Sequence, residues 1–404
     1  MTNKELNLLQ KKKLSKILNY AIDKVPYYKD LNISKPFNIT DFPILTKTIL
    51  RENTDRLISN DYKKELLDKN HSSGSSGVQS FTYMAKSHKF YLRALQTHWW
   101  TWGGYQPGDS LLQIGISPKR GFVKTLKDFF FKIVYLEAFV LNPKLIKNGL
   151  SKFKSKKSFN IAGYPSAIFE IAKVVLKEDK VYNIKSIISY GDKLFTHYIK
   201  AYKKAFNNPI IINTYGCAEG LLIACQVDLP YFYIMSPHVY IEIVNDEGKL
   251  LNDGEMGHIL VTGLTSYGMP LIRYKLGDLG IILPTNEYPN KKKFEYPLLK
   301  TVIGRETDII LTPLGDTLIV HSFTGILEYF IEIKQYKIIQ ISTDEIIVKY
   351  ITDDGNRLKE DTLKSIKMKI NNLTKNSMKI LYKKVSSIAA SPSGKPQIIE
   401  NKII

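Results

Sequence analysis

The stretch His71-Ser72-Ser73-Gly74-Ser75-Ser76-Gly77 places two glycines among four serine hydroxyls, with no large apolar side chain to pack. Glycine lets the backbone turn its N–H groups inward, and serine hydroxyls supply further donors, so such a loop suits oxyanions such as phosphate. Its spacing is not the G-x-x-x-x-G-K-S/T of a Walker loop. Because a Ser/Gly run is also typical of a flexible linker, the rest of the chain has to decide between the two.

Around this loop, short apolar runs alternate with stretches of helical character. The apolar runs predict strands at 81–84, 111–114, 161–163, 186–190 and 210–213. The spacing of apolar residues predicts helices at 4–24, 86–103, 165–177 and 196–206. Alternation of this kind favours an α/β fold, in which a parallel sheet carries helices on both faces.

Two later regions have a different character. Between 238 and 285, strand runs at 239–244 and 257–262 are separated by turn residues, which indicates an antiparallel or barrel-like subdomain. The C-terminal part of the chain reads as a small α+β unit, with a hairpin at 338–350, a helix at 358–372 and a strand at 378–382.

Composition limits the class of protein. A chain of 404 residues with 44% hydrophobic residues is long enough for two or three domains with cores of their own. No apolar run approaches the roughly 20 residues that cross a bilayer, and no secretion signal follows Met1. The two cysteines, Cys217 and Cys225, form no C-x-x-C pair, so a disulfide framework is not expected and a reducing cytoplasm fits.

The net charge of +20 comes from 58 Lys and Arg against 38 Asp and Glu. Nucleic acid, an anionic membrane surface or simple solvation could each explain it. The lysine clusters at 11–13, 154–157 and 291–293 carry no interleaved aromatic residues, which argues against nucleic acid. The segment 119–131, which ends in three phenylalanines, is the best candidate for contact with a membrane, although a buried amphipathic helix explains it equally well.

Four further segments carry polar groups where ligands commonly bind. Residues 213–220, Asn-Thr-Tyr-Gly-Cys-Ala-Glu-Gly, follow a predicted strand, and ligands of α/β sheets bind at that edge. Residues 271–278 place Asp278 on a glycine turn, where it can accept hydrogen bonds from two vicinal hydroxyls. The other two are Gly-Arg-Glu-Thr-Asp at 304–308 and Ser-Pro-Ser-Gly-Lys at 391–395. Taken singly, each has an ordinary explanation: a strand-end cap, a turn aspartate, a surface ion pair or a solvated tail.

Together and in this order, the five segments resemble the core motifs of the adenylate-forming superfamily of acyl-CoA synthetases, nonribosomal adenylation domains and luciferase. Residues 25–28, 42–47 and 270–274 are similar to the phenylacetate–CoA-ligase-like branch, which includes proteins encoded with capsular polysaccharide genes. The resemblance covers essentially the whole chain. It implies a large N-terminal domain of α/β sheets plus a barrel-like β subdomain at 1–304, and a small mobile α+β domain at 305–404.

The resemblance also implies a reaction. A carboxylate attacks the α-phosphate of ATP, which gives an acyl-adenylate and pyrophosphate, and the acyl group then passes to a thiol or an amine. Phosphoryl chemistry of this kind depends mainly on charge neutralisation and alignment. The resemblance assigns the ATP phosphates to the loop residues Ser72, Ser73, Gly74, Ser75, Ser76 and Gly77.

The remaining roles are implied in the same way. Glu219 would hold Mg²⁺, and Lys395 would bridge the substrate carboxylate and the α-phosphate during adenylation. The C-terminal domain would rotate between the half-reactions about Thr307 or Asp308. The resemblance assigns the nucleotide to Gly191, Asp192, Asn213, Thr214, Tyr215, Gly216, Asp278 and Arg305. It assigns the acyl group to Tyr164, Tyr215 and Gly216.

This chain departs from the family pattern in three places. Ser76 stands where threonine is common, and Val78-Gln79 stand where Lys-Pro often follows. The hinge reads Arg-Glu-Thr-Asp rather than Arg-x-Asp-Asp, which leaves the pivot open between Thr307 and Asp308. Residues 287–293 hold no cysteine where some relatives carry a zinc-binding segment, and Cys225 and His238 cannot make a four-ligand site, so zinc is not expected.

The sequence therefore predicts a cytoplasmic, ATP- and Mg²⁺-dependent, AMP-forming ligase that activates a small carboxylic acid. The acceptor is either CoA or an amine, such as a nucleotide sugar or lipid-linked sugar of surface polysaccharide synthesis. Contact with the inner face of the membrane stays open, and nucleic acid is not expected. Two alternatives remain: a catalytically silent binding protein, which would have no physical need to keep Glu219, Asp278, Arg305 and Lys395, and a basic membrane-associated scaffold, which rests on charge alone.

Overall fold

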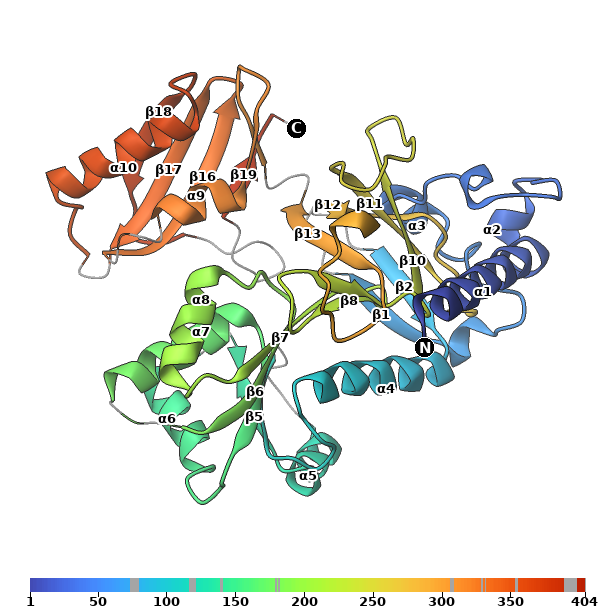
Figure 1. Ribbon diagram of the computed structural model, residues 1–404, viewed down its shortest axis with the longest axis horizontal. Coiled ribbons are helices and arrows are strands. Elements are labelled where there is room, and N and C mark those ends of the chain that lie inside the picture. The colour runs from blue at the N-terminus through green and yellow to red at the C-terminus, as the bar shows by residue number, and fades with distance from the viewer. Residues whose placement is uncertain are drawn as a thin grey trace.

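In the computed structural model, one mixed sheet runs through the first three quarters of the chain (Figure 1). The structure describes residues 1–72, 80–115, 121–138, 141–178, 180, 182–305, 309–327, 330, 332–352, 355–388 and 398–403. In hydrogen-bonded order the strands of the sheet are β10 (Val239–Val244), β11 (Gly257–Gly263), β12 (Tyr274–Ile282), β13 (Leu298–Arg305), β9 (Phe232–Ile234), β8 (Leu221–Gln226), β7 (Ile210–Cys217), β6 (Ile184–Ser189), β5 (Phe159–Gly163), β3 (Leu111–Gly115) and β4 (Ile133–Glu137).

Strands β7, β6, β5, β3 and β4 are parallel and form the α/β half that the sequence predicts. Every residue of β5 is buried, as expected for a strand covered on both faces. Figure 1 shows α6, α7 and α8 on one side of these strands and α4 and α5 on the other. The helices of this half are α4 (Lys86–Trp102), α5 (Phe122–Phe130), α6 (Pro143–Ser151), α7 (Pro165–Lys177) and α8 (Thr196–Ala205). The α/β prediction is thus confirmed.

Strands β8 to β13 pair antiparallel with their neighbours. The antiparallel prediction for 238–285 is confirmed by β10 to β12, and the antiparallel half extends beyond that region to β8, β9 and β13. They are hydrogen-bonded to the parallel strands through β7, so the two halves share one sheet. The N-terminal helices α1 (Asn3–Lys24), α2 (Pro26–Lys29) and α3 (Lys47–Glu52) supply apolar residues to the core of this half. Among the described residues, 3₁₀ turns lie between α2 and α3 at Ile39–Asp41, after α3 at Lys64–Leu66, and after β12 at Thr285–Glu287.

The Ser/Gly loop joins two paired strands. β1 (Asp68–Ser72) and β2 (Ser80–Met84) are antiparallel, with Ser72 opposite Ser80. A two-stranded hairpin of its own therefore holds the ends of the loop, apart from the large sheet. Residues 73–79 lie outside the described part of the chain.

The C-terminal part forms a second unit, and its buried cluster also takes in Phe195, just before α8 of the N-terminal part. Its four-stranded sheet has the order β18 (Lys379–Lys384), β17 (Glu345–Thr352), β16 (Ile333–Ser342) and β19 (Ile399–Asn401). The helix α10 (Glu360–Leu373) buries Ile366 and Ile370 in that cluster. A short hairpin of β14 (Ile309–Leu311) and β15 (Thr317–Ile319) and the helix α9 (Val320–Leu327) link this unit to β13. Within the described residues, no helix combines the length and apolar character of a membrane span.

A buried ion pair anchors the start of β12. Arg273 Nε donates to Glu242 Oε1 and Oε2 at 3.1 and 3.3 Å, and the two residues are only 5% and 2% exposed. Arg273 Nη1 donates to the Phe42 carbonyl at 2.9 Å, and the Arg273 N–H donates to Thr262 Oγ1 at 2.9 Å. Burial raises the pKa of the Glu242 carboxyl, and the Arg273 charge acts against that rise.

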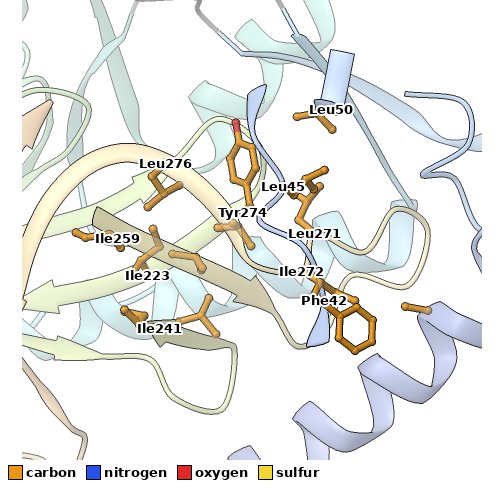
Figure 2. Close-up of a cluster of buried hydrophobic side chains, with 14 of the residues drawn as sticks. Phe42, Leu45, Leu50, Ile223, Ile241, Ile259, Leu271, Ile272, Tyr274 and Leu276 are labelled. Atoms are coloured by element: carbon orange, nitrogen blue, oxygen red, sulfur yellow. The ribbon is translucent and has the colours of Figure 1, made fainter. Parts of the chain in front are cut away.

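The residues on both sides of Arg273 are fixed as well. The Tyr28 hydroxyl accepts from the Ile272 N–H and donates to the Pro270 carbonyl, both at 3.1 Å. Leu45 pairs with Tyr274 as an isolated parallel bridge. Figure 2 shows Phe42, Leu45, Ile272 and Tyr274 within one apolar cluster, with the Tyr274 hydroxyl pointing away from Phe42. The 42–47 and 270–274 segments therefore form one structural unit at the entrance to β12.

Replacing Arg273 tests how strongly the stability of the protein depends on this ion pair. In Arg273→Met, Glu242 stays buried without its cation, so we expect the free energy of unfolding to fall by about 3–5 kcal/mol. Urea denaturation followed by circular dichroism measures this change. Arg273→Met with Glu242→Gln removes the buried charge altogether and should recover a large part of the loss; a single variant within about 1 kcal/mol of wild type would contradict the anchor.

The same variant should acquire a new pH dependence. Burial already raises the folded-state pKa of Glu242, and without Arg273 nothing opposes that rise. A carboxyl whose pKa is higher in the folded state than in the unfolded state loses its stabilising contribution as pH rises through the folded-state pKa. Urea midpoints of Arg273→Met should therefore fall as pH rises above the ordinary glutamate range, and the double variant should not show this fall.

Candidate active site

The turn between β7 and β8 carries the candidate metal ligand Glu219. A bulge interrupts the pairing between Tyr215 and Gly216, and a Cβ on Gly216 would lie 2.5 Å from the Leu221 carbonyl oxygen. Only glycine allows that approach, so the bulge is specified by sequence. The Gly220 N–H then donates to the Cys217 carbonyl at 3.2 Å, which closes the turn around Glu219.

The Glu219 side chain is buried and held by β12. The Tyr274 hydroxyl donates to Glu219 Oε1 at 2.8 Å, and Tyr274 itself is fully buried. On the other side lies Cys217, whose thiol pKa is raised well above its usual value by burial and then by the Glu219 charge. The carboxylate thus has a fixed position at the end of a hairpin rather than a solvated one.

A second bond joins the same two regions. The Tyr215 hydroxyl, on β7, donates to Asp278 Oδ2, on β12, at 2.8 Å. In sheet order β7 and β12 are four steps apart, which would separate them by about 19 Å in a flat sheet at about 4.8 Å a step. Direct contact therefore requires the antiparallel half to curl, in keeping with the barrel-like character expected from the sequence.

The position of Asp278 is set by its own strand. Gly277, immediately before it, has φ +81°, a backbone conformation that favours glycine. Asp278 lies opposite Arg305 in the β12–β13 ladder. Asp278 and Arg305, both predicted to belong to the nucleotide site, are therefore neighbours at backbone level, while the side chain of Arg305 lies outside what the structure describes.

The end of β6 supplies the next group. Gly191 has φ +89°, and a Cβ there would lie 2.4 Å from Tyr164 Cε1, so the Tyr164 ring packs directly on the Gly191 backbone. Asp192 accepts a hydrogen bond of 2.5 Å from Ser166 Oγ. Burial and the Asp192 charge raise the pKa of the Tyr164 phenol. The aromatic ring and the carboxylate thus lie together where β5 and β6 end.

Asn213 and Thr214 lie on the neighbouring strand. In the parallel ladder, Ser189 at the end of β6 stands opposite Asn213. Ser189 Oγ donates to Asn213 Oδ1 at 3.4 Å, and Thr214 Oγ1 donates to the Ser189 carbonyl at 3.0 Å. Asn213 Nδ2 also donates to Gln226 Oε1 at 3.3 Å. These contacts join the ends of β6, β7 and β8 at the carboxyl edge of the parallel strands, where open α/β sheets bind ligands.

The described residues bring together eight of the predicted site residues from three segments. These are 189–193, 213–219 and 274–278, and Lys193 Nζ further ties the first to β13 through the Ile303 carbonyl at 2.7 Å. The β1–β2 hairpin approaches the same turn, because a Cβ on Gly220 would touch Met84 Cε. Several predicted residues lie outside the described ones, namely Ser73, Gly74, Ser75, Ser76, Gly77, Thr307, Asp308 and Lys395; Ser72 is described only as the end of β1.

Sequence reasoning did not assign a role to Tyr274 or Lys193. Tyr274 belongs to the 270–274 segment, whose family resemblance predicts no particular contact for this residue. Its distance of 55 residues from Glu219 in the chain leaves no local signal for the bond. Lys193 directly follows the Gly191-Asp192 turn, and a cation beside a candidate binding turn was the available signal.

Within the described residues, no group of three or more His, Cys, Asp or Glu side chains is placed to hold a metal ion. Mg²⁺ does not require such a group, because proteins bind it through one or two carboxylates together with waters and substrate phosphates. Glu219 is a single carboxylate in a fixed position, which fits that mode of binding. The expectation that the chain carries no zinc stays a prediction.

Comparison with known proteins agrees with this architecture. The family model described as the CapK C-terminal domain matches residues 310–402. Protein CapK of Staphylococcus aureus is 23% identical over an alignment that covers 98% of this chain and 89% of that protein. Phenylacetate-coenzyme A ligase of Escherichia coli K12 is 31% identical over 105 residues, 25% of this chain and 23% of that protein.

A solved structure with the same fold is 2-hydroxyisobutyryl-CoA ligase, crystallised in the postadenylation state in complex with R3-HIB-AMP. Its TM-score is 0.71 at 15% sequence identity, and the match covers 98% of this chain and 88% of that chain. The fold predicted from the five segments is confirmed over nearly the full length of the chain.

Removing the hydroxyl of Tyr215 should loosen the contact across the sheet. Tyr215→Phe deletes a hydrogen bond to a charged group, which we expect to cost about 1.5–3 kcal/mol of folding stability. A double-mutant cycle with Asp278→Asn, measured by urea denaturation, supplies the control. The two effects should be clearly non-additive, and additive effects would show that the pair is not energetically coupled.

Proposed function

Because the chain belongs to the adenylate-forming superfamily, in the phenylacetate–CoA-ligase-like branch that includes the capsular protein CapK, we propose that it activates a small carboxylic acid with ATP. The acid oxygen attacks the α-phosphate, pyrophosphate leaves, and an acyl-adenylate forms. The acyl group then passes to CoA or to an amine. Either acceptor attacks the same activated carbonyl, and AMP leaves.

The observation that carries this proposal is the bond from Tyr215 to Asp278 at 2.8 Å. It places an acidic side chain beside an aromatic ring at the carboxyl edge of the parallel strands. In the proposed site, Asp278 accepts hydrogen bonds from the ribose hydroxyls, and the Tyr215 hydroxyl keeps the carboxylate oriented toward them. Gly191, Asn213, Thr214 and Gly216 border the base and the acyl group, as does the ring of Tyr164.

Glu219 is the proposed Mg²⁺ ligand. A Mg²⁺ ion held there would supply positive charge that offsets the phosphate charge during phosphoryl transfer. The contribution of the chain is to hold one carboxylate in place, through the Tyr274 hydroxyl on Oε1. The Ser72–Gly77 loop would supply N–H and hydroxyl donors to the phosphates.

Lys395 completes the proposed adenylation state. In sequence it lies shortly before β19, the strand that pairs with β16 in the C-terminal sheet. Rotation of residues 305–404 about Thr307 or Asp308 would bring the lysine to the substrate carboxylate and the α-phosphate, and later withdraw it. A long flexible cation suits a charge that is needed in only one half-reaction.

The acceptor and the pathway are finer parts of the same proposal. The resemblance to CapK along nearly the whole chain favours a role in surface polysaccharide synthesis, where a nucleotide or lipid-linked sugar amine would accept the acyl group. CoA is the acceptor that the name of the phenylacetate-coenzyme A ligase relative suggests. Both would be met in the cytoplasm. A silent binding protein is disfavoured because Glu219 and Asp278 each have a defined partner in the site.

The direct test is ATP–pyrophosphate exchange in the presence of Mg²⁺. We expect exchange with one class of acid in a panel of aryl, short-chain, hydroxy and amino acids. CoA and amines are then offered to the enzyme with that acid, and the acyl product identifies the acceptor. Protein that binds ATP yet exchanges with no acid in the panel would contradict the proposal.

Lys395→Ala should separate the two half-reactions. We expect exchange to fall by about 10²-fold or more, because the cation between carboxylate and α-phosphate is lost. Acyl transfer from a preformed acyl-adenylate should stay near wild type. Lys383→Ala, an exposed lysine on β18, is the matched control. Near-normal exchange by Lys395→Ala would remove this residue from the mechanism.

Glu219→Gln should change the metal dependence. The amide keeps an acceptor for Tyr274 but loses the charge that attracts Mg²⁺, so the Mg²⁺ concentration for half-maximal exchange should rise about tenfold. Glu247→Gln, at an exposed turn, should leave the titration unchanged. An unaltered Mg²⁺ titration in Glu219→Gln would rule out the proposed role.

A further inference from the structure

The helix α5 turns its apolar side away from the protein. Leu126, Phe129 and Phe130 are spaced i, i+3 and i+4, so they share one face of the helix. They are 48%, 77% and 71% exposed, and Phe131, just beyond the helix, is 57% exposed. Large side chains clustered on a helix of a soluble domain normally face its core. This face therefore needs an occupant outside the chain.

The charged residues in and just after α5 differ in burial according to their sign. Asp128 is only 9% exposed, whereas Lys127 and the following Lys132 are exposed. In sequence, residues 119–132 contain five basic residues and one acidic residue, and that acid is the buried Asp128. What α5 presents is thus an aromatic surface with a basic rim and its one acid turned inward.

This combination matches the interface of an anionic bilayer. Phenylalanine and leucine side chains enter the boundary between headgroups and acyl chains, and lysines next to them are attracted to anionic lipid phosphates. A second copy of the chain is a poorer occupant, because two proteins of charge +20 repel each other and the basic rims would meet.

The place of α5 in the fold allows such docking. It precedes β4, the edge strand of the large sheet. Figure 1 shows α5 at the opposite end of the molecule from the C-terminal sheet of β16 to β19. A membrane at α5 would leave the C-terminal unit unobstructed.

We propose that α5 is a peripheral docking surface for anionic membranes. Leu126, Phe129 and Phe130 insert into the interface while Lys127 and Lys132 contact lipid phosphates. This inference is independent of the proposed ligase reaction, since its test needs neither ATP nor an acid.

The test is sedimentation of the purified full chain with vesicles of phosphatidylcholine, with and without phosphatidylglycerol. Wild type should bind the anionic vesicles at least about tenfold more strongly, and added salt should weaken that binding. Phe129→Ser with Phe130→Ser should lower binding by about tenfold or more. Lys127→Glu should also weaken it and reduce the salt dependence. Met368→Ser removes a side chain that is 58% exposed on α10 and should bind like wild type.

Two results would overturn the proposal. In the first, the double serine variant, folded by circular dichroism, binds anionic vesicles as wild type does. In the second, wild type does not bind vesicles but self-associates in sedimentation velocity, and the double variant is monomeric; α5 would then be an interface between copies of this chain.

Discussion

The site depends on the buried pair of Arg273 and Glu242. Arg273 ties the segment before β12 to β10, to Thr262 on β11 and to the Phe42 carbonyl, all without access to water. Such a pair adds little net stability, because desolvation of both charges offsets their attraction, but it penalises any other arrangement of the chain heavily. The arrangement that it selects places Tyr274 against Glu219 and, further along the same strand, Asp278 against Tyr215. Both candidate carboxylates are thus positioned from one strand.

The curl of the sheet brings β12, which the ion pair anchors, next to the ends of the parallel strands. The parallel strands end at one edge, where hydrogen bonds from and to Ser189 hold Asn213 and Thr214. The Tyr164 ring packs on Gly191 at the same edge. Strand β12 belongs to the antiparallel half and reaches them only because the sheet bends back on itself. The residues proposed to bind the nucleotide lie where the parallel and antiparallel halves of the sheet meet. In the proposed reaction, residues 305–404 rotate between the two half-reactions. A rigid binding part and a mobile part are expected for an enzyme that carries out two steps.

Local patterning predicted most of the secondary structure. The strands predicted at 161–163 and 210–213 correspond to β5 and β7, and the helices predicted at 4–24 and 165–177 correspond to α1 and α7. Long-range contacts could not be predicted in this way: Arg273 and Glu242 are 31 residues apart, and Tyr215 and Asp278 are 63 apart. A local pattern likewise cannot predict that the parallel and antiparallel halves share one sheet. For the same reason, the sequence does not decide whether α5 faces a membrane or the protein core, since periodicity identifies an apolar face without identifying what covers it.

The roles of the five segments come from their resemblance to the adenylate-forming superfamily, because periodicity identifies elements and not chemistry. The most direct measurement uses the carboxylic acid that supports exchange, labelled with ¹⁸O in its carboxyl group. Acyl transfer through an adenylate leaves one carboxyl oxygen on the phosphate of AMP, so the account predicts ¹⁸O in AMP by mass spectrometry and none in pyrophosphate. Label in inorganic phosphate with ADP as the product would contradict it, because the acid would then have attacked the γ-phosphate.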